Sequence, residues 1–115
     1  MKPHLIGTVG LELAELAHIL TTRSPIALDP DATAAVKRSH AYLRDRLKNS
    51  DAPIYGVNTG FGSLADTRID KKDLAQLQKN LVMSHACGSG DPVPAEIVPA
   101  MLVLKVQNMA FGHSA

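Results

Sequence analysis

Residues 55–62 of the chain read YGVNTGFG, a stretch that combines three glycines with an amide, a hydroxyl and a phenol. Glycines at this density allow the backbone to turn tightly and to approach another group closely. The phenol of Tyr55 stands beside them and is able to act on such a group as an acid or a base. The stretch therefore predicts a glycine-rich loop that forms part of a site.

A second cluster follows at residues 80–90, which read NLVMSHACGSG. It places His85 at the end of a helical pattern of apolar residues, next to a further glycine turn. A packed domain needs neither cluster for its core. We therefore interpret the two stretches together as parts of one functional site.

These stretches, with LADTRI at residues 64–69 between them, resemble the N-terminal part of the aromatic amino-acid ammonia-lyases. The resemblance begins near Leu11, reaches the last residue and is most specific between Tyr55 and Gly90. The triplet Ser-His-Ala at residues 84–86 is most similar to the histidine-specific branch of that family, the histidine ammonia-lyases. The resemblance implies an enzyme of histidine catabolism that eliminates ammonia from L-histidine to give trans-urocanate.

The resemblance also implies a prosthetic group, methylidene-imidazolone, which the family makes autocatalytically from an internal Ala-Ser-Gly. No Ala-Ser-Gly occurs in the 115 residues, which end in GHSA. We therefore expect the 115-residue chain to be inactive alone, as a truncated, incomplete N-terminal part of the lyase domain. The family further implies a homotetramer whose active sites are assembled from several subunits.

By resemblance, Tyr55 is the catalytic base and His85 contacts the imidazole of the substrate. A phenolate is a strong base when nearby N–H groups or cations favour ionisation. From the residue types alone, a packed strand tyrosine and a satisfied core histidine are the more common interpretations. The loop and pocket residues predicted beside them are Gly56, Asn58, Thr59, Gly60, Phe61 and Gly62. Arg68 is expected to pair with an acidic residue that fixes the loop.

Composition limits the other classes of function. Twelve basic and eleven acidic residues give a net charge of +1, which predicts binding to neither nucleic acid nor an anionic membrane. Cys87 is the single cysteine, so no internal disulfide framework exists, and we interpret it as a small buried residue in a cytoplasmic protein. The histidines lack the spacing of a metal site. The glycines do not match the dinucleotide-binding fingerprint.

The patterning predicts a mainly α fold, residues 1–115 forming a single segment of a large helical ammonia-lyase fold. A first helix covers Leu13 to Leu20 with Thr8 as its N-cap, and residues 24–28 form an extended connector. Asp29-Pro30 begins a second helix. Ile54-Tyr55 is expected as a short strand that leads into the glycine-rich loop.

A third helix is expected from Asp70, with Asp73 in a position typical of a capping box. The last helix begins near Ala95 and is apolar nearly all round, so it should be buried. Pro99 marks either its start or a kink. Because one chain of this size has few faces to surround that helix, the sequence predicts missing partner surface.

Two alternatives remain open from the sequence. The first is a segment of a phenylalanine or tyrosine ammonia-lyase, and His85 separates these only in part, since tyrosine-specific members also carry histidine there. The second is a non-catalytic interaction fragment, which the absence of Ala-Ser-Gly favours.

Overall fold

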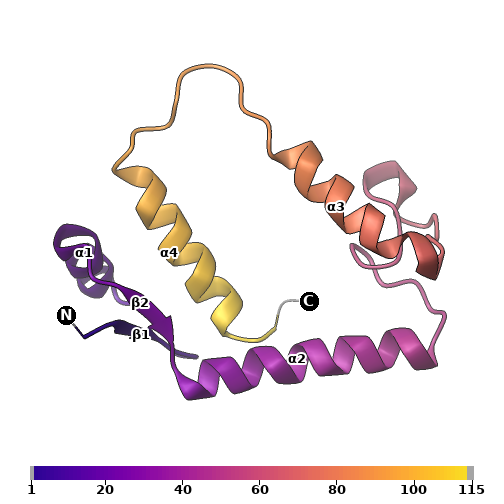
Figure 1. Cartoon of the computed structure of the whole chain (residues 1–115), viewed down its shortest axis with the longest axis horizontal. Helices are drawn as coiled ribbons and strands as arrows, with labels where there is room; N and C mark the ends of the chain where they lie inside the picture. The colour runs from indigo at the N-terminus through magenta and orange to yellow at the C-terminus, as the bar shows by residue number, and fades with distance from the viewer. Residues whose placement is uncertain (1, 114–115) are drawn as a thin grey trace. The chain divides into compact units, whose positions relative to one another are not determined.

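The computed structural model describes residues 2–113 and is mainly helical (Figure 1). The expected mainly α class is therefore confirmed. The chain divides into two compact units. One contains the residues up to Arg46 together with those from Pro92 onward, and the other is Leu47–Asp91. The first unit is thus assembled from two separated parts of the sequence.

The first unit begins with two short parallel strands, β1 (His4–Ile6) and β2 (Ile26–Leu28). Helix α1 (Leu13–Thr22) connects them, as a parallel pair requires a crossover connection (Figure 1). The extended connector predicted for residues 24–28 is this second strand. Its partner was not predicted, because three residues are too few to show a strand's alternation.

Helix α1 begins later than the predicted cap at Thr8. Glu12 is its N-cap, and the backbone N–H of Glu12 donates a hydrogen bond of 2.9 Å to Oε2 of Glu15. The prediction of Thr8 was wrong because this acidic pair stabilises the helix start four residues further on. The helix ends at Arg23, whose left-handed backbone (φ 50°) closes the last turn.

Helix α2 (Pro30–Asn49) starts where Asp29-Pro30 predicts it. The Asp29 carboxylate accepts a hydrogen bond of 2.6 Å from the backbone N–H of Ala32, and Pro30 occupies the first helical position, where no N–H partner is needed. The last three residues of α2 belong to the second unit.

Helix α4 (Ile97–Ala110) places Pro99 in its first turn, which decides between the two predicted possibilities. A proline causes no loss of hydrogen bonding there, since the first N–H groups of a helix have no partner within it. The helix packs against α1 and β1. It closes a small aliphatic core whose buried members are Ile6, Ile19, Ala32, Val103 and Ala110.

One polar side chain links α4 to the start of the chain. Gln107 is only 6% exposed, and its Nε2 donates to the backbone carbonyls of Gly7 (3.1 Å) and Val9 (3.0 Å). The irregular segment after β1 supplies two carbonyls that have no strand partner, and Gln107 satisfies both of them.

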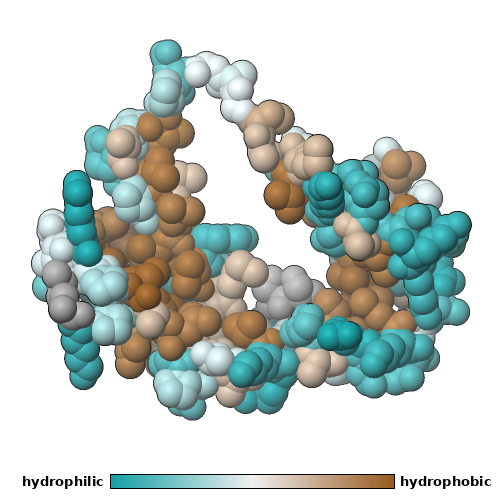
Figure 2. Space-filling model, viewed as in Figure 1, coloured by the Kyte–Doolittle hydropathy of each residue, from teal (hydrophilic) through white to brown (hydrophobic). Residues whose placement is uncertain are grey.

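Much of α4 is apolar and uncovered, as Figure 2 shows along this helix. Met101 is 57% and Leu102 63% exposed. Further exposed apolar side chains on the same helix are Ile97, Val98, Leu104, Val106 and Met109. The helix therefore exposes the apolar surface that the sequence predicts should be covered.

The second unit contains helix α3 (Leu74–His85) and two single-turn 3₁₀ segments, η1 (Gly62–Leu64) and η2 (Lys71–Asp73). A loop joins η1 to η2. The third helix was expected to begin at Asp70, but the α-helix begins at Leu74. Neither Asp70 nor Asp73 makes a side-chain cap, because the 3₁₀ turn intervenes and carries the chain into the helix.

No helix in residues 2–113 is long and apolar enough to cross a membrane.

Candidate active site

Tyr55 does not lie in a strand, contrary to the sequence-based expectation. The backbone N–H groups of Val57 and Asn58 both donate to the carbonyl of Ile54, at 3.0 and 3.2 Å, so the chain turns directly at Tyr55. Gly56 makes this turn feasible, because its φ of 79° is a conformation that residues with a Cβ rarely adopt. The strand prediction failed because Gly56 interrupts the extended pattern at once.

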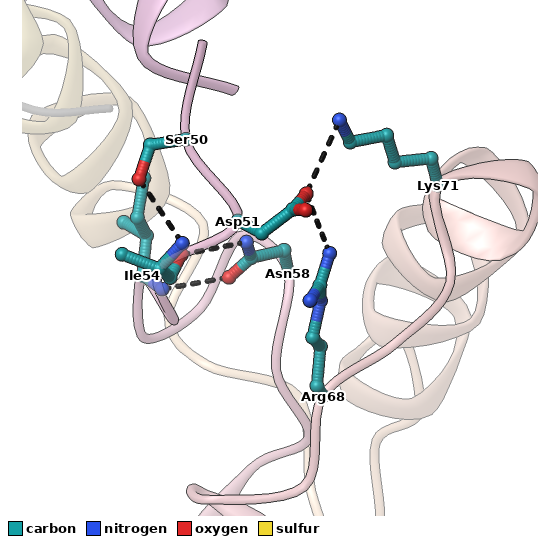
Figure 3. A network of polar contacts seen from close by, with 7 residues as sticks. Ser50, Asp51, Ile54, Asn58, Arg68 and Lys71 are labelled. Atoms are coloured by element: carbon teal, nitrogen blue, oxygen red, sulfur yellow. Dashed lines mark hydrogen bonds and ion pairs between the residues drawn. The ribbon is translucent and has the colours of Figure 1, made fainter. Parts of the chain in front are cut away.

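The side chain of Asn58 organises the start of the loop (Figure 3). It is 5% exposed; its Oδ1 accepts from the backbone N–H of Ile54 (2.6 Å), and its Nδ2 donates to the carbonyl of Ala52 (3.0 Å). Both ends of the buried carboxamide are therefore satisfied. Loss of such a side chain leaves two backbone groups without their partners, which costs about 1–3 kcal/mol for each one that stays buried.

The middle of the loop pairs with the segment that follows η1. Gly60 N–H donates to the carbonyl of Thr67 (2.8 Å), and Ile69 N–H donates to the carbonyl of Asn58 (2.9 Å), forming an antiparallel bridge between Thr59 and Arg68. Thr59 is 1% exposed. Backbone hydrogen bonds on both sides of Thr59 therefore hold the loop against the segment that follows η1.

Gly60 is the position where the loop approaches its own chain most closely. A Cβ at this residue would lie 2.6 Å from the Cβ of Leu64 and 2.7 Å from its carbonyl oxygen. Only a residue without a side chain fits against the η1 turn. The glycine density at 55–62 is thus accounted for by the positive φ of Gly56 (79°) and Gly62 (57°) and by the close approach at Gly60.

Tyr55 is largely exposed at the start of this loop. Tyr55 is 64% exposed, and its ring makes a T-shaped contact with the ring of Phe61, with centroids 6.0 Å apart. No hydrogen bond involves the Tyr55 hydroxyl within residues 2–113. The geometry therefore presents a phenol whose ring contacts a half-buried aromatic neighbour and whose oxygen is open to an incoming molecule.

Helix α3 contributes a contact that the sequence did not predict. Gln78 lies on α3, and its Nε2 donates a hydrogen bond of 3.0 Å to the carbonyl of Gly56, the residue after Tyr55. In the sequence, Gln78 lies within an apolar stripe that contains Leu74, Leu77 and Leu81. A lone amide within such a stripe is the signal that was available, since it needs a polar partner.

The acidic partner of Arg68 is Asp51. Arg68 Nη2 donates to Asp51 Oδ1 at 2.7 Å, and Lys71 Nζ lies 3.3 Å from the same oxygen (Figure 3). The hydrogen bond from Lys71 and the positive charge of Arg68 hold the pKa of Asp51 below its ordinary value. The three charged residues Asp51, Arg68 and Lys71 therefore join the start of the loop to the segment before α3.

His85 ends α3 and is exposed, rather than buried in the core. Its Nδ1 lies 2.9 Å from the carbonyl of Leu81 and 3.0 Å from Oγ of Ser84, which itself donates to the Leu81 carbonyl. A carbonyl only accepts, so this geometry assigns the ring hydrogen to Nδ1. In the neutral ring, Nε2 is then left as a free acceptor. No hydrogen bond or ring contact joins His85 to Tyr55 in the part of the chain that the structure describes.

Cys87 is exposed, which contradicts the expectation of a buried residue. It follows the end of α3, where the chain leaves the helix for an exposed segment, and its Sγ donates weakly to the carbonyl of Ser84 (3.4 Å). Among residues 2–113, no group of three or more histidine, cysteine, aspartate or glutamate side chains is placed to hold a metal ion.

With this geometry in place, comparison with known proteins gives one consistent family. Residues 11–115 match the family described as "Aromatic amino acid lyase". The chain is 47% identical over 110 residues to a histidine ammonia-lyase of Myxococcus xanthus, covering 96% of this chain and 22% of that protein. It is 45% identical over 105 residues to a histidine ammonia-lyase of Geobacillus thermodenitrificans, covering 91% of this chain and 21% of that one.

Two solved structures also have a similar fold. A tyrosine aminomutase from Streptomyces globisporus superposes with a TM-score of 0.88 at 26% identity, over 98% of this chain and 21% of that structure. An ergothionase from Treponema denticola, an enzyme that degrades ergothioneine, superposes with a TM-score of 0.88 at 27% identity, over 97% of this chain and 22% of that structure. The chain spans about a fifth of the length of the curated relatives it matches.

Proposed function

The chain belongs to the aromatic amino acid lyase family, and from this premise we propose that it is the N-terminal part of a histidine ammonia-lyase. The observation that carries the proposal is an identity of 40–47% to histidine ammonia-lyases over 90–96% of the chain. The identity to the tyrosine aminomutase is lower, at 26%. A phenylalanine or tyrosine lyase is therefore the less favoured alternative.

In the proposed reaction, the β-carbon of L-histidine loses a proton and the amino group departs with the electrons of the C–N bond. The electrons of the C–H bond form the new double bond, giving trans-urocanate and ammonia. The phenolic oxygen of Tyr55 takes the proton. The support for this role is its exposed ring on a loop that is held on both sides of its centre.

We assign substrate recognition to His85. The contact of its Nδ1 with the Leu81 carbonyl leaves Nε2 as an acceptor. An imidazole substrate carries one ring N–H, which is the complementary donor. A phenylalanine side chain carries no such group, so the arrangement favours histidine. Phe61 supplies an apolar wall beside the base, while Asn58, Thr59 and the glycines at 56, 60 and 62 shape the loop.

The family's prosthetic group, methylidene-imidazolone, cannot be formed from these residues by themselves. It requires an internal Ala-Ser-Gly, and residues 1–115 contain none. The roles that we propose for this chain are therefore proton abstraction and recognition of the substrate side chain.

Assembly and location are part of the same proposal. The exposed apolar side chains of α4 support an assembly in which further protein surface covers this helix, such as the homotetramer that the family resemblance implies. A single cysteine, which excludes an internal disulfide framework, supports a cytoplasmic location.

The test is a pair of tyrosine variants in a complete enzyme that contains these 115 residues. Tyr55→Phe removes only the hydroxyl, so kcat for urocanate formation should fall at least ~10²-fold, the lower end for general acid–base catalysis. Tyr42→Phe is the matched control, since Tyr42 is also exposed but lies on α2. Unchanged turnover in Tyr55→Phe, or a complete enzyme without activity on histidine, would contradict the proposal.

A further inference from the structure

The two backbone groups that flank Tyr55 are each held by an amide side chain. Asn58 Oδ1 accepts from the N–H of Ile54 at 2.6 Å, and Gln78 Nε2 donates to the carbonyl of Gly56 at 3.0 Å. We propose that Asn58 and Gln78 are positioning residues that together fix the backbone from which Tyr55 presents its hydroxyl. This inference rests on the proposed function of Tyr55 as the base.

Asn58 fixes the backbone before Tyr55. Its carboxamide bonds to Ala52 on one side of Pro53 and to Ile54 on the other, so it bridges a residue that has no N–H of its own (Figure 3). Its own carbonyl accepts from Ile69 N–H at 2.9 Å, which anchors the residue to the paired segment. The buried Asn58 therefore holds the backbone before Tyr55 in a fixed position relative to that paired segment.

Gln78 fixes the backbone after Tyr55. It comes from α3, 22 residues further along the chain, so this contact is independent of the local turn. The carbonyl that it holds belongs to Gly56, the residue with a φ of 79°. A glycine in this conformation has many alternatives open to it, and an external hydrogen bond selects one of them.

Within residues 2–113, the backbone on both sides of Tyr55 is held by more contacts than its side chain is. The ring is mostly exposed, its one ring contact is the T-shaped contact with Phe61, and its hydroxyl has no hydrogen-bond partner within residues 2–113. The backbone hydrogen bonds on both sides of Tyr55 fix the position of its Cα and the direction of its Cα–Cβ bond, from which the ring takes its staggered rotamers. Because proton abstraction requires the base close to the β-carbon, a displacement of about 1 Å is enough to lower the rate up to ~10²-fold.

The first experiment compares two glutamines of the same helix in the complete enzyme. Gln78→Leu removes the bond to Gly56, and Gln76→Leu is its matched control, because Gln76 donates only to Asn80 on α3 itself (2.7 Å). Both side chains are exposed and leucine is a good helix former, so both variants should fold. We expect Gln78→Leu to lower kcat roughly tenfold with KM for histidine little changed, and Gln76→Leu to stay within about twofold.

The second experiment asks whether Asn58 acts through Tyr55. Asn58→Leu and Tyr55→Phe are combined in a double-mutant cycle. If Asn58 positions the base, its loss should lower kcat in the wild type but cause no further loss once the hydroxyl of Tyr55 is gone. A purely structural role would lower the rate by the same factor in both backgrounds, and that result would overturn the proposal. Asn58→Asp keeps the acceptor for Ile54 and should recover part of the rate.

Hydrogen exchange gives a readout that does not depend on activity. In Asn58→Leu, peptides that contain Ile54 and Val57 should exchange faster, while peptides from the middle of α3 should not change. Unchanged exchange at Ile54 would overturn the positioning role. If Tyr55→Phe keeps full turnover, the proposed function fails instead, and hydrogen exchange still decides whether Asn58 holds the loop.

Discussion

Arg68 donates a hydrogen bond of 2.7 Å to the carboxylate of Asp51, seventeen residues earlier in the chain. This pair ties the segment after the glycine-rich loop to the segment before it, and Lys71 shares the same carboxylate oxygen. Ion pairs therefore join the two ends of the loop that carries Tyr55, in addition to the hydrogen bonds within the loop.

Asp51 should titrate at lower pH than an ordinary aspartate. The hydrogen bond from Lys71 is the largest cause and the charge of Arg68 the next, and both lower the pKa below 3.8. NMR titration of the Asp51 carboxyl should show its midpoint rising in Lys71→Gln and in Arg68→Gln. Lys72→Gln is the matched control, because Lys72 lies 3.9 Å from Asp70 instead.

The sign of the effect on stability follows from this shift. A pKa that is depressed in the folded state contributes stability above the unfolded pKa, and this contribution disappears as the pH falls through the folded pKa. Asp51→Asn should therefore destabilise the protein at neutral pH, with the difference from wild type vanishing in acid. The loss should be small and salt-dependent, since these side chains are exposed. A difference that grows in acid would contradict the assignment.

His85→Leu should change specificity more than general activity. Leucine retains helical propensity but removes the acceptor that we assign to the substrate imidazole. In the complete enzyme, kcat/KM for histidine should fall at least about tenfold more than any residual activity on phenylalanine, because unpaired polar groups discriminate between substrates. Kinetics with both substrates measure this. Equal losses on both would assign His85 a structural role only.

Gly60→Ala should destabilise the loop, because a Cβ there would meet Leu64 at 2.6 Å. Part of the clash is with the Leu64 carbonyl oxygen, at 2.7 Å, which no side-chain rearrangement removes. We expect a loss of about 1–3 kcal/mol, as for other overpacked sites, measured by denaturant unfolding. Gly88→Ala is the matched control, since a Cβ there meets no atom within 4 Å. Equal stability of the two variants would show that the loop accommodates a side chain.

A polypeptide of these 115 residues should associate with itself through α4. Leu102 is 63% exposed and lies among other exposed apolar side chains, a kind of surface that drives association. Light scattering should show a concentration-dependent mass that falls towards the monomer in Leu102→Gln. Leu13→Gln is the matched control, since Leu13 is 80% exposed on a different helix. A monomer at high concentration would contradict this prediction.

The same polypeptide should have no ammonia-lyase activity by itself, because its sequence contains no Ala-Ser-Gly. Purified polypeptide with L-histidine should give no urocanate absorbance above a heat-treated sample. A complete enzyme of the family, assayed in parallel, shows that the conditions support the reaction. Urocanate formation by the polypeptide would show that the proposed division of roles is wrong.

The sequence predicted those elements whose signals are local. Asp29-Pro30 marked the start of α2, because a cap and a proline act within one turn. Arg68 was expected to have an acidic partner, but Asp51 could not be named, since pairing across seventeen residues depends on the path of the chain. The parallel pairing of His4–Ile6 with Ile26–Leu28 was missed because strands of three residues are too short to show an alternation.

The site residues stay a prediction, and the structure adds the hydrogen bonds that hold them. Tyr55 and the glycines were proposed from their composition and from the family resemblance, and Asn58 was predicted as a residue of the loop. Which groups it bonds was not foreseen, and neither was the bond from Gln78, because hydrogen bonds between a loop and a later helix leave no periodic pattern in a sequence. The strand expected at Ile54-Tyr55 failed because the conformation of Gly56 outweighed the β-propensity of its neighbours.

The discontinuity of the first unit has a consequence for the order of folding. Gln107 bonds to Gly7, 100 residues earlier, and the core around Ile6 and Ile19 is closed by Val103 and Ala110. On the ribosome, the N-terminal strands and α1 therefore emerge long before the helix that covers them. Contacts of such high sequence separation close slowly, so this half-built core stays exposed while residues 47–91 are translated. Nascent chains that stall before α4 should for this reason be good chaperone substrates.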